Sequence, residues 1–215
     1  MLGDDGRGTE LNETRENFGI PANLRRRDRF LCHASLPMSE ETIQIAVVGA
    51  SGYTGQELLR LLAQHPHVDV VSVTSRQEAG KKLTSVFPRL RGASKFDDLC
   101  FMDPDVDAIV ATGAKVAFLA LPHGLASEYA APLLEQGLKV IDLSADFRLR
   151  DPAVFEEFYG GVHPAPELLS RAVYGLPEFY PTEISGADLV ASPGCYPTSL
   201  LLPLVPLLEK GLIAT

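Results

Sequence analysis

A cysteine near the end of the chain has the clearest chemical potential in this sequence. Cys195 lies between an extended apolar run that ends at Ala191 and a helix-like apolar run over residues 200–208. Gly194 permits a tight turn without Cβ strain, and Pro197 suits the first turn of a helix. A thiol at a helix N-terminus faces unpaired N–H groups and the positive end of the helix dipole, which favour the reactive thiolate. The sequence therefore predicts that Cys195 is a nucleophile, with a buried structural cysteine as the alternative.

A glycine-rich stretch, residues 49–55, directly follows an apolar run over residues 43–48. Gly49 allows a tight turn, Gly52 lets the backbone approach a pyrophosphate, and Gly55 allows a helix to pack closely on a strand. The N-terminus of that helix offers N–H groups and positive potential to phosphates. Because the stretch lies in a strand, turn, helix, strand sequence, it predicts a dinucleotide site. A tight turn without a ligand is the alternative.

Ser75 and Arg76 follow the second expected strand and indicate which dinucleotide is bound. In NAD-binding folds an acidic residue stands about 20 residues after the glycines, where it bonds the ribose 2′-hydroxyl. Here the first acidic residue is Glu78, whereas an arginine and a hydroxyl suit a 2′-phosphate. We therefore expect NADP as the cofactor, with a solvated surface arginine as the alternative.

A dinucleotide site and an activated cysteine together predict hydride transfer at an acyl carbon or aldehyde bound to the thiol. Such a site also needs a general acid or base, which is usually histidine. His123 follows an expected strand on the cofactor side, and His163 lies in an expected loop. The sequence identifies neither of them as the base.

Composition narrows the function classes further. The chain has 215 residues, a formal net charge of −9 and 46% hydrophobic residues. A globular core is expected, and nucleic acid is disfavoured as a partner because phosphate binding needs a basic face. The three cysteines form no Cys-x-x-Cys pair, so we expect neither a metal site nor a disulfide framework. Reduced cysteines favour a cytoplasmic location. No apolar run approaches the roughly 20 residues of a membrane helix.

The expected elements alternate between strands and helices, which indicates an α/β fold with a doubly wound, Rossmann-like sheet. Strands are expected at 43–48, 68–73, 115–121, 139–143 and 188–191. Helices are expected after the glycine loop, with an apolar face of Leu58, Leu59, Leu61 and Leu62, and at 105–112, 126–136, 151–159 and 200–208. Residues 80–92 are expected to form a partly exposed, mobile loop.

This pattern divides the chain into three parts. Residues 1–40 show no apolar period and are expected to be a disordered N-terminal extension, with a transit peptide or an upstream start as alternatives. Residues 41–191 are expected to form the NADP-binding Rossmann domain. Residues 192–215 are expected to form the nucleophile turn and the first helix of an α+β catalytic domain that is mostly missing.

Five blocks in residues 43–215 closely resemble the N-acetyl-γ-glutamyl-phosphate reductase family of the semialdehyde dehydrogenase superfamily. They are Gly49-Ala-Ser-Gly-Tyr-Thr-Gly55, Leu121-Pro-His-Gly124, Asp142-Leu-Ser-Ala-Asp-Phe-Arg148, Tyr174-Gly-Leu-Pro-Glu178 and Pro193-Gly-Cys-Tyr-Pro-Thr198. The resemblance implies NADPH-dependent reductive dephosphorylation of N-acetyl-glutamyl 5-phosphate through a cysteine acyl-enzyme, a step of arginine biosynthesis. An aspartate-semialdehyde dehydrogenase-like enzyme and a non-catalytic dinucleotide-binding fragment are the alternatives.

The resemblance also implies roles for single residues. Cys195 matches the nucleophile, and Arg148 and Glu178 are expected to bind substrate, with a structural Asp146–Arg148 ion pair as the alternative. The residues expected to bind the cofactor are Gly49, Ser51, Gly52, Tyr53, Thr54, Gly55, Ser75, Arg76, Leu121, Pro122 and Ser144.

Two departures from the family pattern stand out. Ser192 replaces an asparagine that is frequent in the family. Family members are also much longer, and the part that continues beyond this point carries the histidine base. The chain is therefore expected to be truncated, to have little activity alone, and to expose the apolar side of helix 200–208. In the full-length form we expect a homo-oligomer.

Overall fold

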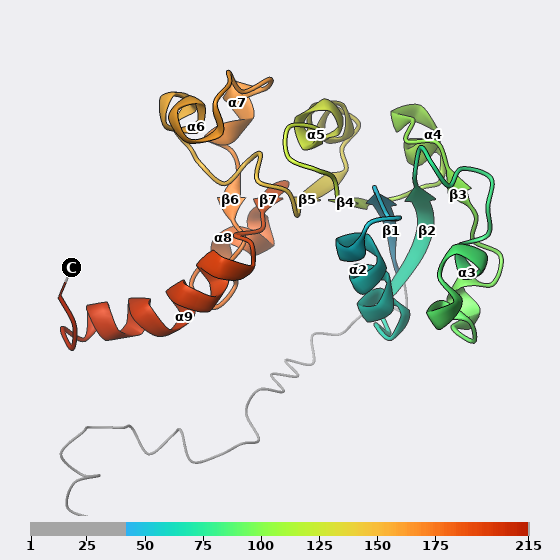
Figure 1. Ribbon diagram of the computed structural model, residues 1–215, viewed down its shortest axis with the longest axis horizontal. Coiled ribbons are helices and arrows are strands. Elements are labelled where there is room, and N and C mark those ends of the chain that lie inside the picture. Colours follow the sequence, from blue (N-terminus) through green and yellow to red (C-terminus); the bar gives the residue numbers. More distant parts are fainter. Residues whose placement is uncertain (1–41, 215) are drawn as a thin grey trace, which may run out of the picture. The chain divides into compact units, whose positions relative to one another are not determined.

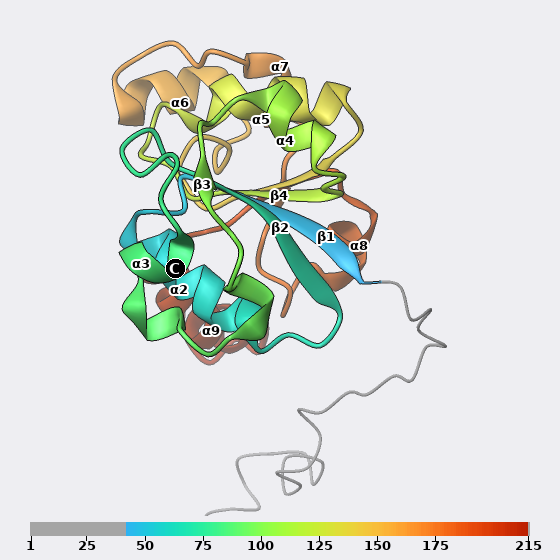
Figure 2. The ribbon, with the colours of Figure 1, turned by 90° about the vertical axis from the view of Figure 1, so that its right-hand side faces the viewer.

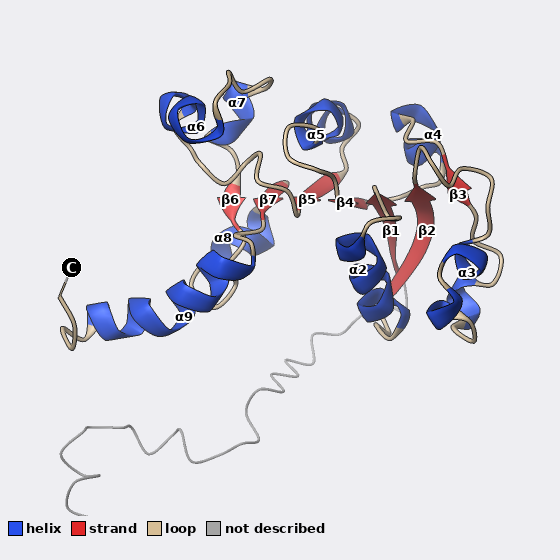
Figure 3. Ribbon diagram, in the orientation of Figure 1, coloured by secondary structure: helices blue, strands red, loops and turns tan. Residues whose placement is uncertain are grey.

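Seven strands form one parallel sheet, which the computed structural model describes within residues 42–214. The extension expected at residues 1–40 lies outside the described residues. The strand order is β3-β2-β1-β4-β5-β7-β6, and every neighbouring pair is parallel (Figure 3). The strands are β1 (Ile43–Val48), β2 (Val68–Thr74), β3 (Phe101–Met102), β4 (Val116–Leu119), β5 (Lys139–Asp142), β6 (Val173–Tyr174) and β7 (Leu189–Ala191).

Helices cover both faces of this sheet, so the predicted doubly wound α/β fold is confirmed. Figures 1 and 2 show α4, α5, α6 and α7 on one face, and α2, α3 and α9 on the other. The helices are α2 (Tyr53–Ala63), α3 (Leu83–Val86), α4 (Val106–Ala111), α5 (Ala126–Glu135), α6 (Pro152–Tyr159), α7 (Pro166–Leu169), α8 (Pro181–Gly186) and α9 (Cys195–Glu209).

The strand order reverses between β1 and β4, which makes their carboxyl ends the topological switch point. In open α/β sheets, ligands bind in the crevice outside the carboxyl ends of the strands at this point. β1 suits the centre of the sheet because its last four residues, Ile45 to Val48, are all buried. Two apolar clusters, one on each face, hold α5 and α2 against the sheet.

Most expected elements are confirmed, and the differences come from short or locally ambiguous segments. The two-residue strands β3 and β6 and the short helices α7 and α8 were not expected, because such segments are too brief to show a period. Leu61 was expected on the apolar face of α2 but is 54% exposed. The buried residues of this helix are Gly55, Leu59 and Leu62.

The segment over residues 80–92 is partly exposed, as expected, but it is more regular than a loop. The segment contains α3 and a 3₁₀ turn, Pro88–Leu90, and a second 3₁₀ turn, Ser94–Phe96, follows. Leu83, Phe87 and Leu90 are buried in the cluster that also holds α2. Burial of these apolar side chains stabilises the segment against the sheet, which the neighbouring glycines and lysines concealed in the sequence.

Helix α9 begins at Cys195 and continues through Pro203 and Pro206. None of its side chains, all within the described range, is buried. Leu200, Leu204, Leu207 and Leu208 are among the exposed large apolar residues of the chain, which confirms the expected exposed apolar side. Over residues 42–214, no helix has both the length and the apolar character needed to cross a membrane.

Candidate active site

The glycine loop connects β1 to α2 at the switch point. Gly49 has φ +79°, and a Cβ there would lie 2.6 Å from the carbonyl oxygen of Ala120 at the end of β4. A Cβ on Gly55 would lie 2.6 Å from Cα of Ala50, so this glycine lets α2 pack directly on the loop. A side chain at either position would force the backbone apart.

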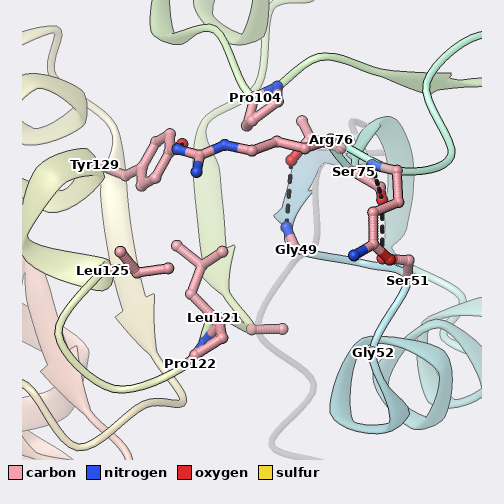
Figure 4. Close-up of a pocket in the computed structure, with 13 residues that line it drawn as sticks. Gly49, Ser51, Gly52, Ser75, Arg76, Pro104, Leu121, Pro122, Leu125 and Tyr129 are labelled. Atoms are coloured by element: carbon pink, nitrogen blue, oxygen red, sulfur yellow. Dashed lines mark hydrogen bonds between the residues drawn. The ribbon is translucent and has the colours of Figure 1, made fainter.

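A pocket of about 310 Å³ opens beside this loop, at the carboxyl ends of β1, β2 and β4 (Figure 4). Among the residues expected to bind the cofactor, those that line it are Gly49, Ser51, Gly52, Ser75, Arg76, Leu121 and Pro122. Six other lining residues were not expected from the sequence, namely Thr74, Gln77, Pro104, Ala120, Leu125 and Tyr129. Thr74 and Ala120 could have been expected in the pocket because they lie at the ends of strands. Nothing in the sequence near Tyr129 indicated that it lines the pocket.

Four other residues that were expected to bind the cofactor do not line this pocket. Tyr53 and Thr54 begin α2 with exposed side chains, and Tyr53 borders a separate pocket with Arg60 and Arg89. Gly55 is buried beneath the loop. Ser144 is buried and bonded to Asp142, as described below.

Side chains at the end of β2 hold the loop and extend across the pocket. Thr74 Oγ1 accepts a hydrogen bond from the Gly49 N–H at 3.2 Å, and the hydroxyls of Ser51 and Ser75 are 2.9 Å apart. Arg76 Nη2 donates to the hydroxyl of Tyr129, on α5, at 3.1 Å (Figure 4). The Arg76 guanidinium is thereby held next to Tyr129, on the side of the pocket away from the Ser51 and Ser75 hydroxyls (Figure 4).

The pocket has the features that a bound dinucleotide requires. Gly52 is the N-cap of α2 and has no side-chain capping bond, so N–H groups of the first turn remain available to phosphate. The nearest atom to a Cβ built on Gly52 is the Gly49 oxygen at 3.8 Å, which leaves room for a ligand to approach the backbone. Leu121, Pro122 and Leu125 give apolar surface for flat rings. The residues that line the pocket therefore fit a bound dinucleotide.

Asp146, after β5, organises the neighbouring loop after β4. Its Oδ1 lies 2.8 Å from His123 Nδ1 and accepts from the Gly124 N–H at 2.8 Å, while Oδ2 accepts from the Ala126 N–H at 2.9 Å. This buried carboxylate caps α5, whose own N-cap residue, Leu125, has no capping side chain. The alternative of an Asp146–Arg148 ion pair is wrong, because these bonds occupy the carboxylate and no such pair occurs within residues 42–214.

The two histidines considered as bases have different surroundings. The His123 side chain is 43% exposed, lies beside the tilted ring of Tyr159 with ring centroids 4.7 Å apart, and is oriented by Asp146. His163 is buried, and burial lowers its pKa. Its Nδ1 accepts from the Ala165 N–H at 3.0 Å, so Nε2 is the protonated nitrogen that donates to the Asp146 carbonyl at 3.0 Å. Both nitrogens of His163 are thus used in structural bonds.

Asp142, at the carboxyl end of β5, is a buried carboxyl group whose pKa burial raises to about 6. Both of its oxygens accept from Ser144, from the N–H and from Oγ, each at 2.9 Å. Ser144 Oγ also accepts from the Asp146 N–H at 3.1 Å. Ser144 therefore supports the loop after β5 instead of lining the cofactor pocket.

The cysteine turn follows β7, which pairs with β5 at Asp142 and Ala191. Gly194 has φ +89°, and Cys195 is the first residue of α9, with an exposed side chain. Arg148 Nε donates to the Ser192 carbonyl at 2.8 Å, and both terminal nitrogens of Arg148 lie 3.0 Å from the position of a Cβ on Gly194.

The structure therefore brings together two of the predicted site residues, Cys195 and Arg148. Because Arg148 binds the backbone of Ser192, the turn does not depend on the side chain at that position. Glu178, which was expected to bind substrate, is exposed in the segment between β6 and α8. Within the described part of the chain its side chain has no hydrogen bond or ion pair.

Comparisons with known proteins agree with this architecture. Residues 44–187 match the family model described as semialdehyde dehydrogenase, NAD binding domain. Two curated relatives named N-acetyl-gamma-glutamyl-phosphate reductase, from Akkermansia muciniphila and Nitrosococcus oceani, are 60% and 52% identical over 171 residues. That alignment covers 80% of this chain and 49% of each relative, so the chain spans about half the length of the curated relatives it matches.

Two solved structures share the fold. Aspartate semialdehyde dehydrogenase with NADP from Candida albicans has a TM-score of 0.58 at 20% identity, covering 79% of this chain and 48% of that one. Aspartate semialdehyde dehydrogenase II from Vibrio cholerae has a TM-score of 0.55 at 19% identity, covering 79% and 47%. The switch-point pocket and the match over most of the described residues lead to one conclusion: the chain belongs to the semialdehyde dehydrogenase family and contains its NAD-binding domain.

Proposed function

We propose that the chain is the cofactor-binding and nucleophile-bearing half of an NADP-dependent N-acetyl-γ-glutamyl-phosphate reductase. The observation that carries this proposal is the exposed Cys195 at the start of α9, with Arg148 against its turn. The turn lies at the same edge of the sheet as the dinucleotide pocket. The names of the curated relatives supply the substrate, N-acetyl-glutamyl 5-phosphate.

Cys195 performs the covalent part of this chemistry. Its thiolate attacks the acyl carbon, a C–S bond forms, and the C–O bond to phosphate breaks, so that phosphate leaves with the bonding electrons. Arg148 stabilises the negative charge of the departing phosphate through charge-assisted hydrogen bonds. When bound, the reduced dinucleotide supplies the hydride that converts the thioester to the aldehyde level. After hydride addition, an electron pair on the negatively charged oxygen re-forms the C=O bond, and the C–S bond breaks with its electrons leaving on sulfur. The aldehyde is released and the Cys195 thiolate is restored without a net proton transfer.

The preference for NADP is part of the proposal. Arg76 lies at the rim of the pocket, after β2, where the ribose of a bound dinucleotide is expected. The Tyr129 hydroxyl orients its guanidinium, while the Ser51 and Ser75 hydroxyls lie 2.9 Å from each other beside the glycine loop. The Arg76 guanidinium therefore offers a cation to a 2′-phosphate at the rim of the pocket.

We also propose the domain division expected from the sequence, with residues 41–191 binding NADP and residues 192–215 beginning the catalytic part. The exposed leucines of α9 support this division, because an apolar helix face of this kind is typical of a surface that packs against further structure. The homo-oligomer and the cytoplasmic location remain predictions.

The test measures acylation of the thiol by intact-protein mass. Incubation with N-acetyl-glutamyl 5-phosphate is expected to add one N-acetylglutamyl group to the wild-type chain and none to Cys195→Ser. Cys100→Ser is the matched control, because Cys100 is a second exposed free cysteine, and it should acylate like wild type. Acylation of Cys195→Ser at the wild-type rate would refute the nucleophile assignment.

A further inference from the structure

A second polar pocket lies at the same edge of the sheet, beside β6. It has a volume of about 400 Å³ and is lined by Arg148, Arg150, Val173, Tyr174, Tyr180 and Glu183. These residues come from the loop after β5, from β6, and from the start of α8. Tyr174 pairs with Ala191 of β7, only four residues before Cys195.

Arg148 connects this pocket to the nucleophile. It lines the pocket, and its terminal nitrogens lie 3.0 Å from the position of a Cβ on Gly194. Of its five N–H donors, Nε–H is bonded to Ser192 and one Nη2–H makes a long, 3.4 Å bond to Leu143. Three donors therefore remain for a ligand that approaches Cys195 from this pocket.

Arg150 brings a second, separate cation to the pocket. It is exposed, and within residues 42–214 no ion pair or hydrogen bond engages its guanidinium. Tyr174 adds a neutral hydroxyl donor, since burial raises its pKa further above neutral pH. Glu183 is the one acidic residue among the lining residues, which leaves the pocket with a net positive charge.

We infer that Arg150 recognises a second anionic group of the substrate, a carboxylate, while Arg148 binds the group that reacts at Cys195. This inference rests on the proposed function, whose substrate carries a carboxylate at the end opposite its acyl phosphate. Arginine suits this role because its planar fork makes two parallel bonds to a carboxylate. Arg150 therefore selects amino-acid-derived acyl phosphates over those without the carboxylate.

The test compares two probes that differ only in that carboxylate. N-acetyl-L-glutamate carries both acidic groups, whereas 4-acetamidobutyrate lacks the α-carboxylate. Because the chain has no tryptophan, binding can be followed by tyrosine fluorescence, to which Tyr174 and Tyr180 contribute. Wild type is expected to bind N-acetyl-L-glutamate about tenfold more tightly, the size of one charge-assisted contact.

Arg150→Gln should remove that difference and leave 4-acetamidobutyrate binding unchanged. Arg89→Gln, which removes the same charge at a different pocket, should retain it. The inference is overturned if Arg150→Gln still discriminates, or if wild type binds both probes equally or binds neither. Acylation of Cys195 without carboxylate selectivity would contradict this inference alone, whereas selectivity without acylation would contradict the proposed function alone.

Discussion

Removing the carboxylate of Asp146 should destabilise the chain far more than removing an ordinary helix cap. Asp146→Ala deletes the acceptor of three bonds of 2.8–2.9 Å, from His123, Gly124 and Ala126. Hydrogen bonds to charged groups contribute roughly 1.5–3 kcal/mol each, and removing one partner leaves buried N–H groups unsatisfied. Since the lost charge also had a desolvation cost, we expect a net loss of about 4 kcal/mol in the free energy of unfolding.

Urea denaturation of the chain measures this loss, and the chain supplies its own control. Asp151 caps α6 through one exposed bond, from the Ala153 N–H at 2.8 Å. Asp151→Ala should therefore cost only about 1 kcal/mol, the usual value for a helix cap. Asp146→Asn, which keeps one acceptor oxygen, should fall between the two. If Asp146→Ala costs no more than Asp151→Ala, Asp146 is not the residue that organises the loop after β4.

Three further predictions concern other parts of the site. Burial raises the folded-state pKa of Asp142 from 3.8 to about 6. The contribution of this carboxyl group to the free energy of unfolding is therefore complete below about pH 4 and is lost as the pH rises through 6. At 1.36 kcal/mol per pKa unit, that contribution is roughly 3 kcal/mol. Asp142→Asn should flatten the unfolding free energy over that pH range, and an unchanged pH profile would contradict the assignment. Gly55→Ala should destabilise the chain by about 1–3 kcal/mol through overpacking against Ala50, whereas Gly161→Ala, with open space around it, should not, as thermal denaturation will show. Arg76→Asp should abolish or reverse a preference for NADP over NAD in a binding titration, and equal affinities in the wild type would refute the 2′-phosphate role.

The features that depend on local pattern could be predicted from the sequence. The apolar run Ile43–Val48 and the glycines that follow it specify a buried parallel strand and its turn, because both signals lie within a few neighbouring residues. The same holds for α9, which begins at Cys195 after a glycine with positive φ. The same holds for α6, which was expected at residues 151–159 and begins directly after its cap residue, Asp151.

The features that depend on contacts between distant residues could not be predicted. Tyr129 meets Arg76 across 53 positions of sequence, and Asp146 caps a helix that begins 20 residues before it. Nothing in the neighbourhood of either residue specifies such a partner. From the sequence, an Asp146–Arg148 ion pair was open as an alternative. Only the fold shows that Asp146 binds the loop after β4 and not Arg148.

The proposed function depends above all on acylation of Cys195 with loss of phosphate. The most direct measurement mixes the chain with N-acetyl-glutamyl 5-phosphate, counts the phosphate released in the first turnover, and locates the acyl group by peptide mapping. We expect one equivalent of phosphate per chain and an N-acetylglutamyl thioester on the peptide that contains Cys195. An acyl group on any other residue, or no phosphate release, would contradict it.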